Sequence, residues 1–325
     1  MFRKLIVPLD RSQVAEQAIG RAASLARAAG ASIELVLVHE PFPFAGFKDV
    51  PWPSDWLNDA QYLESIAVEL HASAGVEVTH SVMQGAPAEM IGLRANELKA
   101  DLIVLTSHGR TGWSRAWLGS VADSLIRHAS IPVLMLRAEE VPSERAKAPP
   151  PFKHILVPHD GSKLAADVLP TAIDLARANS ARMSLLRVVP PVPLATALDV
   201  AMPFATLPLR NEAATQELAA RCQEELEDMA TRMSDRETIE IRAKILVDQH
   251  PAEAIVDFAR AHHVDVIAMS THGHGVSRWL LGSVADKVVR GAGVPVLLRR
   301  PSGVRENRLI TEGSVIEQLP ALAGE

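Results

Sequence analysis

Short apolar runs alternate with amphipathic stretches along this chain, and the alternation occurs twice. In the first half, the apolar runs predict five strands, at Leu5–Val7, Ile33–Val38, Val76–Val82, Leu102–Leu105 and Pro132–Leu136. The stretches with helical spacing predict four helices, at Gln13–Ala29, Tyr62–Ala72, Ala88–Leu98 and Ser120–His128. Alternating strands and helices are typical of an α/β fold with a parallel, doubly wound sheet and helices on both faces.

The second half repeats this order with a longer middle. Its predicted strands are Ile155–Val157, Met183–Val189, Ile239–Val247, Val264–Met269 and Val294–Leu298. Its predicted helices are Val168–Ala178, Ala213–Met233, Ala252–Ala261 and Ser283–Arg290. Proline-rich stretches within Pro41–Trp56 and Val188–Leu209 are expected to be loops.

Short motifs recur between the halves and define the size of the repeat. Val-Pro-Leu-Asp-Arg-Ser at residues 7–12 matches Val-Pro-His-Asp-Gly-Ser at residues 157–162, an offset of 150. Gly-Ser-Val-Ala-Asp occurs at residues 119–123 and again at residues 282–286. A repeat of this length is a whole domain. We expect domains at residues 1–138 and 152–301, a charged and proline-rich linker at 139–151, and a tail at 302–325.

Composition narrows the class of protein. The chain has 325 residues, of which 48% are hydrophobic and 22% charged, as in ordinary globular proteins. Its net charge of −6 argues against general attraction to nucleic acid or to anionic membranes. The single cysteine, Cys222, cannot form an internal disulfide, and the short apolar start of the chain does not predict a signal peptide. We therefore expect a cytoplasmic protein.

The candidate chemistry lies after the first and fourth strands of each half. Asp10 and Asp160 follow the first strand, and glycine-containing loops that lead into Ser120 and Ser283 follow the fourth. Parallel sheets bind ligands at the carboxyl ends of strands where the strand order reverses. If strands one and four are neighbours, each half places a carboxylate opposite a helix N-terminus, which attracts anions such as phosphate.

Each of these features also has a structural interpretation. Asp-x-Ser before an apolar stripe is typical of a helix cap, and the loop glycines can be simple turn residues. His108 and His272 could contact phosphate or be hydrogen-bonded structural histidines. The pair His262 and His263 invites a metal hypothesis, which we reject because no cysteine is near and adjacent helical side chains diverge.

These residues resemble the universal stress protein family. The features that carry the resemblance are the two Val-Pro-x-Asp-x-Ser starts, Pro-Ala-Glu at residues 87–89 and 251–253, and the two His-Gly…Gly-Ser-Val-Ala-Asp stretches. The resemblance implies two tandem domains, each a five-stranded parallel sheet of order 3-2-1-4-5. It also implies that the domains pair through their last strands as an internal pseudo-dimer, with a homodimer of the whole chain as a further possibility.

Many members of the family bind ATP through the pattern Gly-x2-Gly-x9-Gly-Ser/Thr. The first half keeps Gly109, the nine-residue spacer, Gly119 and Ser120, with Thr106 in place of the leading glycine. The second half has Ser270 in the leading position and a spacer of eight residues between Gly273 and Gly282. The first half is therefore closer to the pattern.

The resemblance implies a set of candidate nucleotide contacts in each half. In the first half they are Pro8, Leu9, Asp10, Val38, Thr106, His108, Gly109, Arg110, Gly119, Ser120 and Val121. In the second half they are Pro158, His159, Asp160, Val188, Ser270, His272, Gly273, Gly282, Ser283 and Val284. Asp10 and Asp160 are expected at the adenosine, and Val38 and Val188 against the adenine. Mg²⁺ could accompany the triphosphate.

No catalytic pattern stands out, because the chain has neither a nucleophile elbow nor a Walker-type phosphate loop. The resemblance, together with the candidate crevice, implies an adenine-nucleotide-binding stress-response or signalling module with, at most, slow ATP hydrolysis. The alternative is a nucleotide-free interaction module whose loops are purely structural. A pocket for another ligand beneath the apolar loops Phe42–Trp56 and Val192–Leu207 is a third hypothesis.

Overall fold

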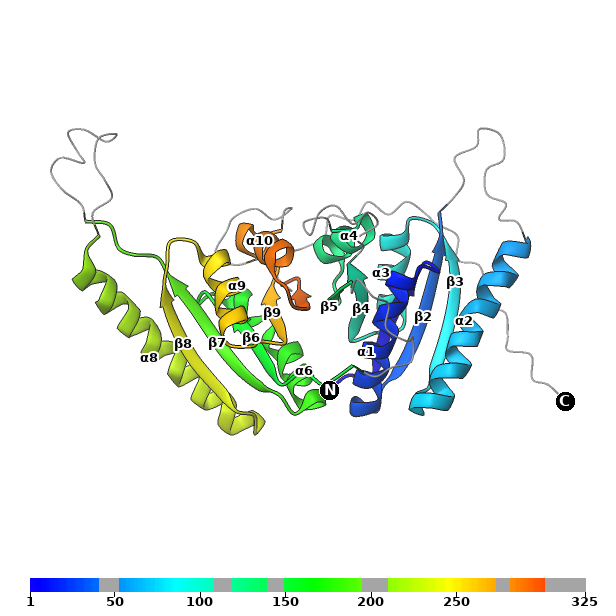
Figure 1. Cartoon of the computed structure of the whole chain (residues 1–325), viewed down its shortest axis with the longest axis horizontal. Helices are drawn as coiled ribbons and strands as arrows, with labels where there is room; N and C mark the ends of the chain where they lie inside the picture. Colours follow the sequence, from blue (N-terminus) through cyan, green and yellow to red (C-terminus); the bar gives the residue numbers. More distant parts are fainter. Residues whose placement is uncertain (41–52, 108–117, 139–148, 195–209, 273–280, 302–325) are drawn as a thin grey trace, which may run out of the picture. The chain divides into compact units, whose positions relative to one another are not determined.

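The structure, a computed structural model, describes residues 1–40, 53–107, 118–138, 149–194, 210–272 and 281–301. It forms two compact units, one within Met1–Pro150 and the other within Pro151–Pro301 (Figure 1). The tail at 302–325 and most of the expected linker lie outside the described residues. Each unit is described by itself below.

Unit 1 is a parallel five-stranded sheet with helices on both faces. Its strands are β1 (Lys4–Leu9), β2 (Ser32–His39), β3 (Val78–Gln84), β4 (Leu102–Ser107) and β5 (Val133–Arg137). Its helices are α1 (Gln13–Ala29), α2 (Pro53–Ala74), α3 (Pro87–Glu97) and α4 (Ser120–His128). The strand order is 3-2-1-4-5, as the family resemblance implies.

Unit 2 repeats this architecture. Its strands are β6 (His154–Pro158), β7 (Arg182–Val189), β8 (Ile241–Val247), β9 (Val266–Ser270) and β10 (Val296–Arg299). Its helices are α5 (Lys163–Ala166), α6 (Leu169–Asn179), α8 (Glu212–Glu237), α9 (Pro251–Ala261) and α10 (Ser283–Gly291). The sheet order β8-β7-β6-β9-β10 corresponds strand for strand to that of unit 1.

The two faces of each sheet are distinguished by their side-chain partners. Glu34 of β2 contacts Arg94 of α3, whereas His39, at an odd position of the same strand, contacts Asp59 of α2. Successive side chains of a strand point to opposite faces. Therefore α3 packs on one face and α2 on the other, with α1 against α2 and α4 against α3.

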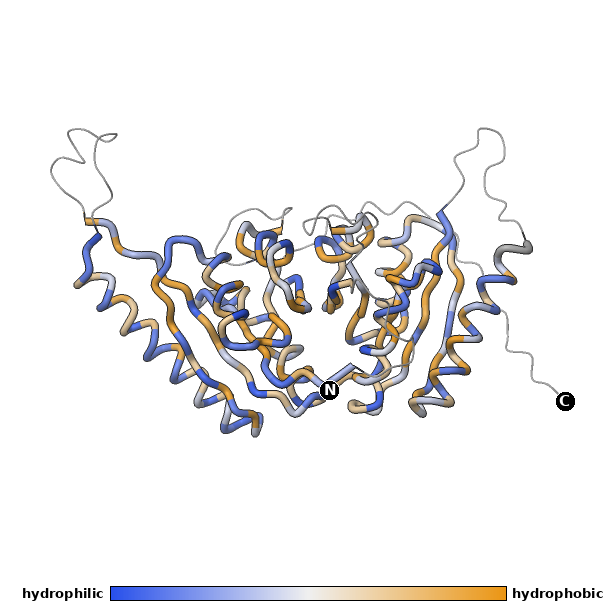
Figure 2. Tube along the Cα trace, in the orientation of Figure 1, coloured by the Kyte–Doolittle hydropathy of each residue, from blue (hydrophilic) through white to orange (hydrophobic). Residues whose placement is uncertain are grey.

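The core follows from the apolar runs in the sequence. Central strands such as β1, β4 and β6 are almost entirely buried, and Figure 2 shows them mainly in the hydrophobic colour. Full burial of such side chains contributes about 1.5–3 kcal/mol each before the entropy of ordering is subtracted. The edge strands β3 and β8 are only partly buried.

The predicted start of one helix was wrong. Helix α2 begins at Pro53, about two turns before the predicted Tyr62, so Trp56 lies in a helix and not in a loop. Its buried stripe includes a polar residue, Asp59, which interrupts the apolar pattern. The predicted helix Val168–Ala178 is confirmed as α6, with Pro170 in its first turn, and the additional short helix α5 precedes it.

Among the described helices, none is both long enough and apolar enough to cross a membrane. The described residues also contain no group of three or more histidine, cysteine or acidic side chains placed to hold a metal ion. The histidine pair lies beyond the helix that we expected to carry it: His262 caps α9 and packs against the ring of Phe258, and His263 has a positive φ of 50°.

Candidate functional site

The neighbouring strands β1 and β4 define the candidate crevice of unit 1. Leu5 of β1 pairs with Leu102 of β4, and on its other side β1 pairs with β2. The strand order reverses at this point, so the loop after β1 and the loop after β4 leave the same edge of the sheet. In unit 2, β6 lies between β7 and β9 in the same way.

The loop after the first strand has the same geometry in both units. Ser12 caps α1 by accepting the Ala15 N–H at 3.1 Å, and Ser162 caps α5 by accepting the Ala165 N–H at 3.0 Å. The serine, not the aspartate, is thus the helix cap. Asp10 Oδ1 accepts the Ser12 N–H at 3.0 Å, and its side chain lies at the protein surface. Its carboxylate is therefore oriented by its own turn.

Asp160 repeats this turn, with Oδ1 accepting the Ser162 N–H at 2.9 Å. The residue before it, His159, is 3% exposed, and its Nδ1 accepts the Gly161 N–H at 3.0 Å. Because Nδ1 is the acceptor, the proton of the neutral ring is on Nε2. His159 therefore supports the loop from inside.

The loop after the fourth strand reaches a helix N-terminus in each unit. Gly119 caps α4 and Gly282 caps α10, and neither provides a side-chain cap. The first intrahelical bond of α4 is from the Asp123 N–H to the Gly119 carbonyl at 2.8 Å. The N–H groups of residues 120–122 precede it, so they have no acceptor within the helix. Such groups and the helix dipole favour an anion.

The leading positions Thr106 and Ser270 are buried. The Ser270 hydroxyl donates to the Ala165 carbonyl of α5 at 3.4 Å, so its side chain points to the face of the first helix. Thr106 occupies the same place in β4, and its Oγ1 is buried with no hydrogen-bond partner among the described residues.

Unit 2 uses one of its loop donors internally. The Gly282 N–H donates to the Thr271 carbonyl at 2.8 Å, and a β-carbon at Gly282 would lie 3.0 Å from that oxygen. The glycine is required by this close approach. His272 is 8% exposed, and its Nδ1 lies 2.9 Å from the Thr271 hydroxyl. These contacts tie the loop of unit 2 to its own strand.

The adenine candidates lie near the ends of the second strands. Val38 pairs with Met83 of β3, and Val188 pairs with Leu246 of β8. Both are half-buried. The buried Leu9, directly after Pro8, ends β1, and Pro158 ends β6. Val121 and Val284 are half-buried in the first turns of α4 and α10. His108, Gly109, Arg110 and Gly273 lie outside the described residues.

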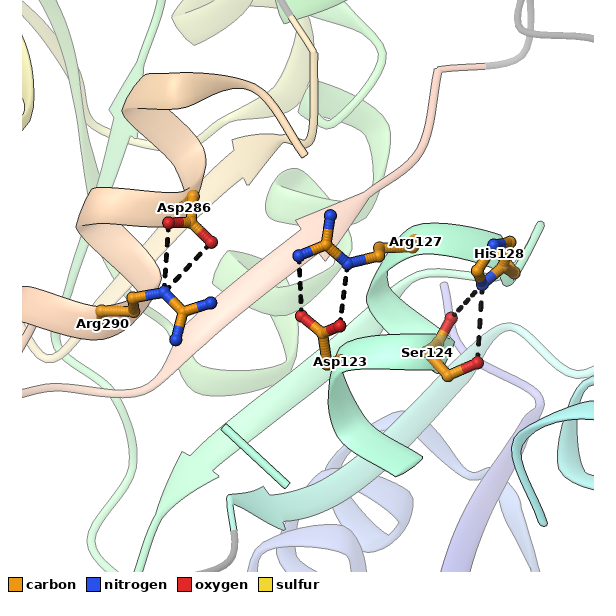
Figure 3. A network of polar contacts seen from close by, with 6 residues as sticks. All are labelled: Asp123, Ser124, Arg127, His128, Asp286 and Arg290. Carbon is orange, nitrogen blue, oxygen red and sulfur yellow. Dashed lines mark hydrogen bonds and ion pairs between the residues drawn. The ribbon is translucent and has the colours of Figure 1, made fainter. Parts of the chain in front are cut away.

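The first turns of α4 and α10 carry matching ion pairs (Figure 3). Asp123 accepts hydrogen bonds from Arg127 Nε and Nη2 at 2.8 and 3.0 Å. Both carboxylate oxygens of Asp286 lie 3.1 Å from Arg290 Nε. A carboxylate in the first turn would compete with a bound anion, and in each helix an arginine one turn on neutralises it.

Sequence reasoning missed a second group of charged residues around unit 1. Arg11, directly after Asp10, contacts Asp59 of α2, and His39, directly after Val38, contacts the same carboxylate. No repeat signal identified them, because their counterparts Gly161 and Val189 are uncharged. Arg137, which register places beside Ser107, was also missed. Burial lowers the pKa of Arg137.

The sequence matches the universal stress protein family twice, over residues 1–137 and 151–300. A universal stress protein of Methanocaldococcus jannaschii is 31% identical over 144 residues, which are 42% of this chain and 83% of that protein.

A solved structure of the family has the same fold. The crystal structure of a universal stress protein from Archaeoglobus fulgidus has a TM-score of 0.64 at 18% identity, and covers 91% of this chain and 98% of its own. Another universal stress protein, solved in complex with cAMP, is 22% identical with a TM-score of 0.34, and covers 42% of this chain and 98% of its own. This chain belongs to the universal stress protein family, with two of its domains in tandem.

Proposed function

We propose that the chain binds an adenine nucleotide, ATP in the first place, in the crevices of its units and acts as a stress-response or signalling module. The observation that carries the proposal is that two loops leave the same edge of the sheet of unit 1. Asp10 follows β1, which pairs with β4, and the segment after β4 leads to the first turn of α4, which has no side-chain cap. A carboxylate suits hydroxyl and amino groups of a nucleoside, and helix N–H groups suit phosphate.

Within this proposal each half of the nucleotide has its own residues. Ser120 and Val121, with Gly119 at the cap, hold phosphate through their N–H groups. Asp10 and Val38 hold the nucleoside. The described residues offer no metal cluster, so Mg²⁺ would be held by the phosphates and water. The chain positions the ligand and supplies no identified nucleophile or general base.

The units are not equivalent in this proposal. In unit 2 the Gly282 N–H donates to the Thr271 carbonyl and is therefore not available to an anion. We propose that unit 1 binds more firmly. The same contact favours a second candidate function for unit 2, a nucleotide-free structural or partner-binding domain. Pairing of the two domains, or of two chains, stays a prediction, as does residence in the cytoplasm.

Isothermal titration with ATP of the protein stripped of ligand tests the proposal. We expect heat of binding, and a greater loss of affinity for Asp10→Ala than for the matched Asp160→Ala. Mass spectrometry of the protein as purified should detect an adenine nucleotide. Absence of heat at millimolar ATP, with no nucleotide carried from the cell, would reject the proposal and leave the scaffold function.

A further inference from the structure

One buried carboxylate in unit 1 contacts the two segments that the proposed function assigns to the nucleoside. Asp59 of α2 is 3% exposed. Its Oδ1 is paired with the guanidinium of Arg11, and its Oδ2 lies 2.5 Å from His39 Nε2. A carboxylate out of water needs such partners, because its desolvation is costly when it is left alone.

The two partners of Asp59 have a notable place in the sequence. Arg11 is the residue directly after Asp10, and His39 is the residue directly after Val38. Asp10 directly follows β1, and Val38 lies near the end of the neighbouring strand β2, where Leu37 pairs with Leu9 of β1. Asp59 therefore joins the backbone of the carboxylate loop to the end of the strand that carries the adenine candidate.

Aromatic rings support both partners. The guanidinium of Arg11 lies 5.6 Å from the ring centre of Tyr62, whose hydroxyl donates to Glu16 at 2.6 Å. His39 stacks on Trp56, with ring centres 5.9 Å apart and an interplanar angle of 21°. The contacts come from α1, α2, β2 and the loop after β1, so the cluster fixes these elements together.

The backbone of Arg11 indicates that this arrangement constrains the loop. Arg11 has φ of 62°, in the left-handed region that non-glycine residues seldom adopt. The residue at the same place in unit 2 is Gly161, with φ of 89°. In unit 1 a non-glycine residue, Arg11, thus adopts a left-handed backbone conformation while its side chain pairs with Asp59. Arg11 directly precedes Ser12, whose N–H orients Asp10.

Unit 2 lacks this connection. The residues after Asp160 and Val188 are Gly161 and Val189, neither of which can pair with a carboxylate. Arg187 of β7 lies over Gly161 and pairs with Glu225 of α8 at 3.1 Å, but Glu225 is 65% exposed. An exposed pair of this kind constrains its neighbours weakly.

The geometry points to Asp59 as a positioning residue that sets the spacing between Asp10 and Val38 and so determines the affinity of unit 1 for the nucleoside part of its ligand. This inference rests on the proposed function. Asp59 acts through Arg11 and His39 and need not contact the ligand. Holding both contacts in place before binding lowers the cost of ordering them.

Two ligands distinguish a positioning role of Asp59 from a general loss of structure in unit 1. ATP reports the nucleoside and phosphate contacts together, and inorganic tripolyphosphate reports the helix N-terminus alone. For Asp59→Asn we expect the ATP dissociation constant to rise about tenfold, the kind of loss that small misplacements cause, while the tripolyphosphate constant stays near that of the parent. Glu225→Gln is the matched control in unit 2 and should change neither constant.

A second variant keeps the test decisive if Asp59→Asn does not fold. Arg11→Gly suits the positive φ, as Gly161 does in unit 2, and removes the connection to Asp59. It should weaken ATP and spare tripolyphosphate in the same way. Equal weakening of both probes, or no weakening of ATP by the folded variants, overturns the inference while the proposed function stands. If the parent protein binds no ATP, both the inference about Asp59 and the proposed function are rejected.

Discussion

The loops after the first strands of the two units show how a repeated fold keeps an arrangement while changing its residues. Unit 1 has Arg11 in the loop and a buried carboxylate, Asp59, in α2. Unit 2 has a glycine in the loop, and an arginine from β7 reaches over it to Glu225 of α8. Each unit thus places a guanidinium between the loop and the long helix, but only unit 1 buries its acid.

A similar contrast exists on the opposite face. In unit 1, Glu34 of β2 is 1% exposed and is held by Arg94 Nε and Nη2 at 3.0 and 2.8 Å and by the Thr79 hydroxyl. In unit 2 the corresponding position is Ser184, which pairs with His154 at 2.8 Å. One repeat has a charged network and the other a neutral pair. Their energetic consequences should therefore differ.

The largest effect is expected from breaking the charged network. Arg94→Met leaves Glu34 buried without its cation, which should destabilise unit 1 by about 3–5 kcal/mol. Hydrogen exchange of the β2 amides measures this locally, because a chain with two domains need not unfold in one step. Ser184→Ala is the matched change in unit 2, with an expected loss of about 1 kcal/mol at β7. Equal losses at the two sites would contradict the contrast.

A second, smaller effect concerns the close approach that distinguishes the loop of unit 2. Gly282→Ala would bring a β-carbon to 3.0 Å from the Thr271 carbonyl, a backbone atom that cannot move alone. We expect unit 2 to lose about 1–2 kcal/mol, as overpacking typically costs. The control is Gly293→Ala, where no atom lies within 4 Å of the added carbon. Thermal unfolding of the two variants should differ, and an unchanged Gly282→Ala would show that the loop yields.

The third prediction uses the neutral pair of unit 2. His154 donates from Nδ1 to the His262 carbonyl at 3.2 Å and accepts the Ser184 hydroxyl at Nε2. Burial, assisted by the charge of Arg182, lowers the pKa of His154. The unfolded chain therefore takes up a proton at His154 at a higher pH than the folded chain does. The stability that neutral His154 contributes is complete above about pH 6.5 and is lost as the pH falls towards the pKa of His154 in the folded protein.

Hydrogen exchange of the β7 amides between pH 7.5 and 5.5 measures this loss. Each unit by which the pKa is lowered corresponds to about 1.4 kcal/mol. His154→Gln should lose less stability over this range than the parent, although the other histidines titrate in both. A parent and variant with the same pH dependence would show that His154 is not the group responsible.

The tandem architecture and the strand order of each unit could be predicted because they depend on repeated patterns. Apolar runs fixed the strands, and two copies of Gly-Ser-Val-Ala-Asp located both helix N-termini. The role of Ser12 and Ser162 as caps also follows from local chemistry, since a hydroxyl three residues before a free N–H satisfies it.

The charged clusters could not be predicted, because they join residues far apart in the sequence. Asp59 interrupts the apolar stripe of α2, so the sequence pattern placed the start of that helix after it. Whether Arg11 meets Asp59 depends on how α2 packs beside β2, a tertiary property. The contact of Ser270 with α5 likewise depends on strand parity and on the position of the first helix, which no local sequence pattern gives.

The smallest effect is expected where the units agree most closely, at the ion pairs of α4 and α10 (Figure 3). Arg127 binds Asp123 through Nε and Nη2, and its side chain is 22% exposed, whereas Arg290, which binds Asp286 through Nε, is 39% exposed. Exposed pairs one helical turn apart contribute about 0.3–0.5 kcal/mol. Asp123→Asn should therefore cost slightly more than Asp286→Asn in thermal unfolding at low salt, and added salt should remove both losses. A loss above about 1 kcal/mol in either variant would mean that the aspartate also holds the glycine loop, and that this pair serves the crevice as well as its own helix.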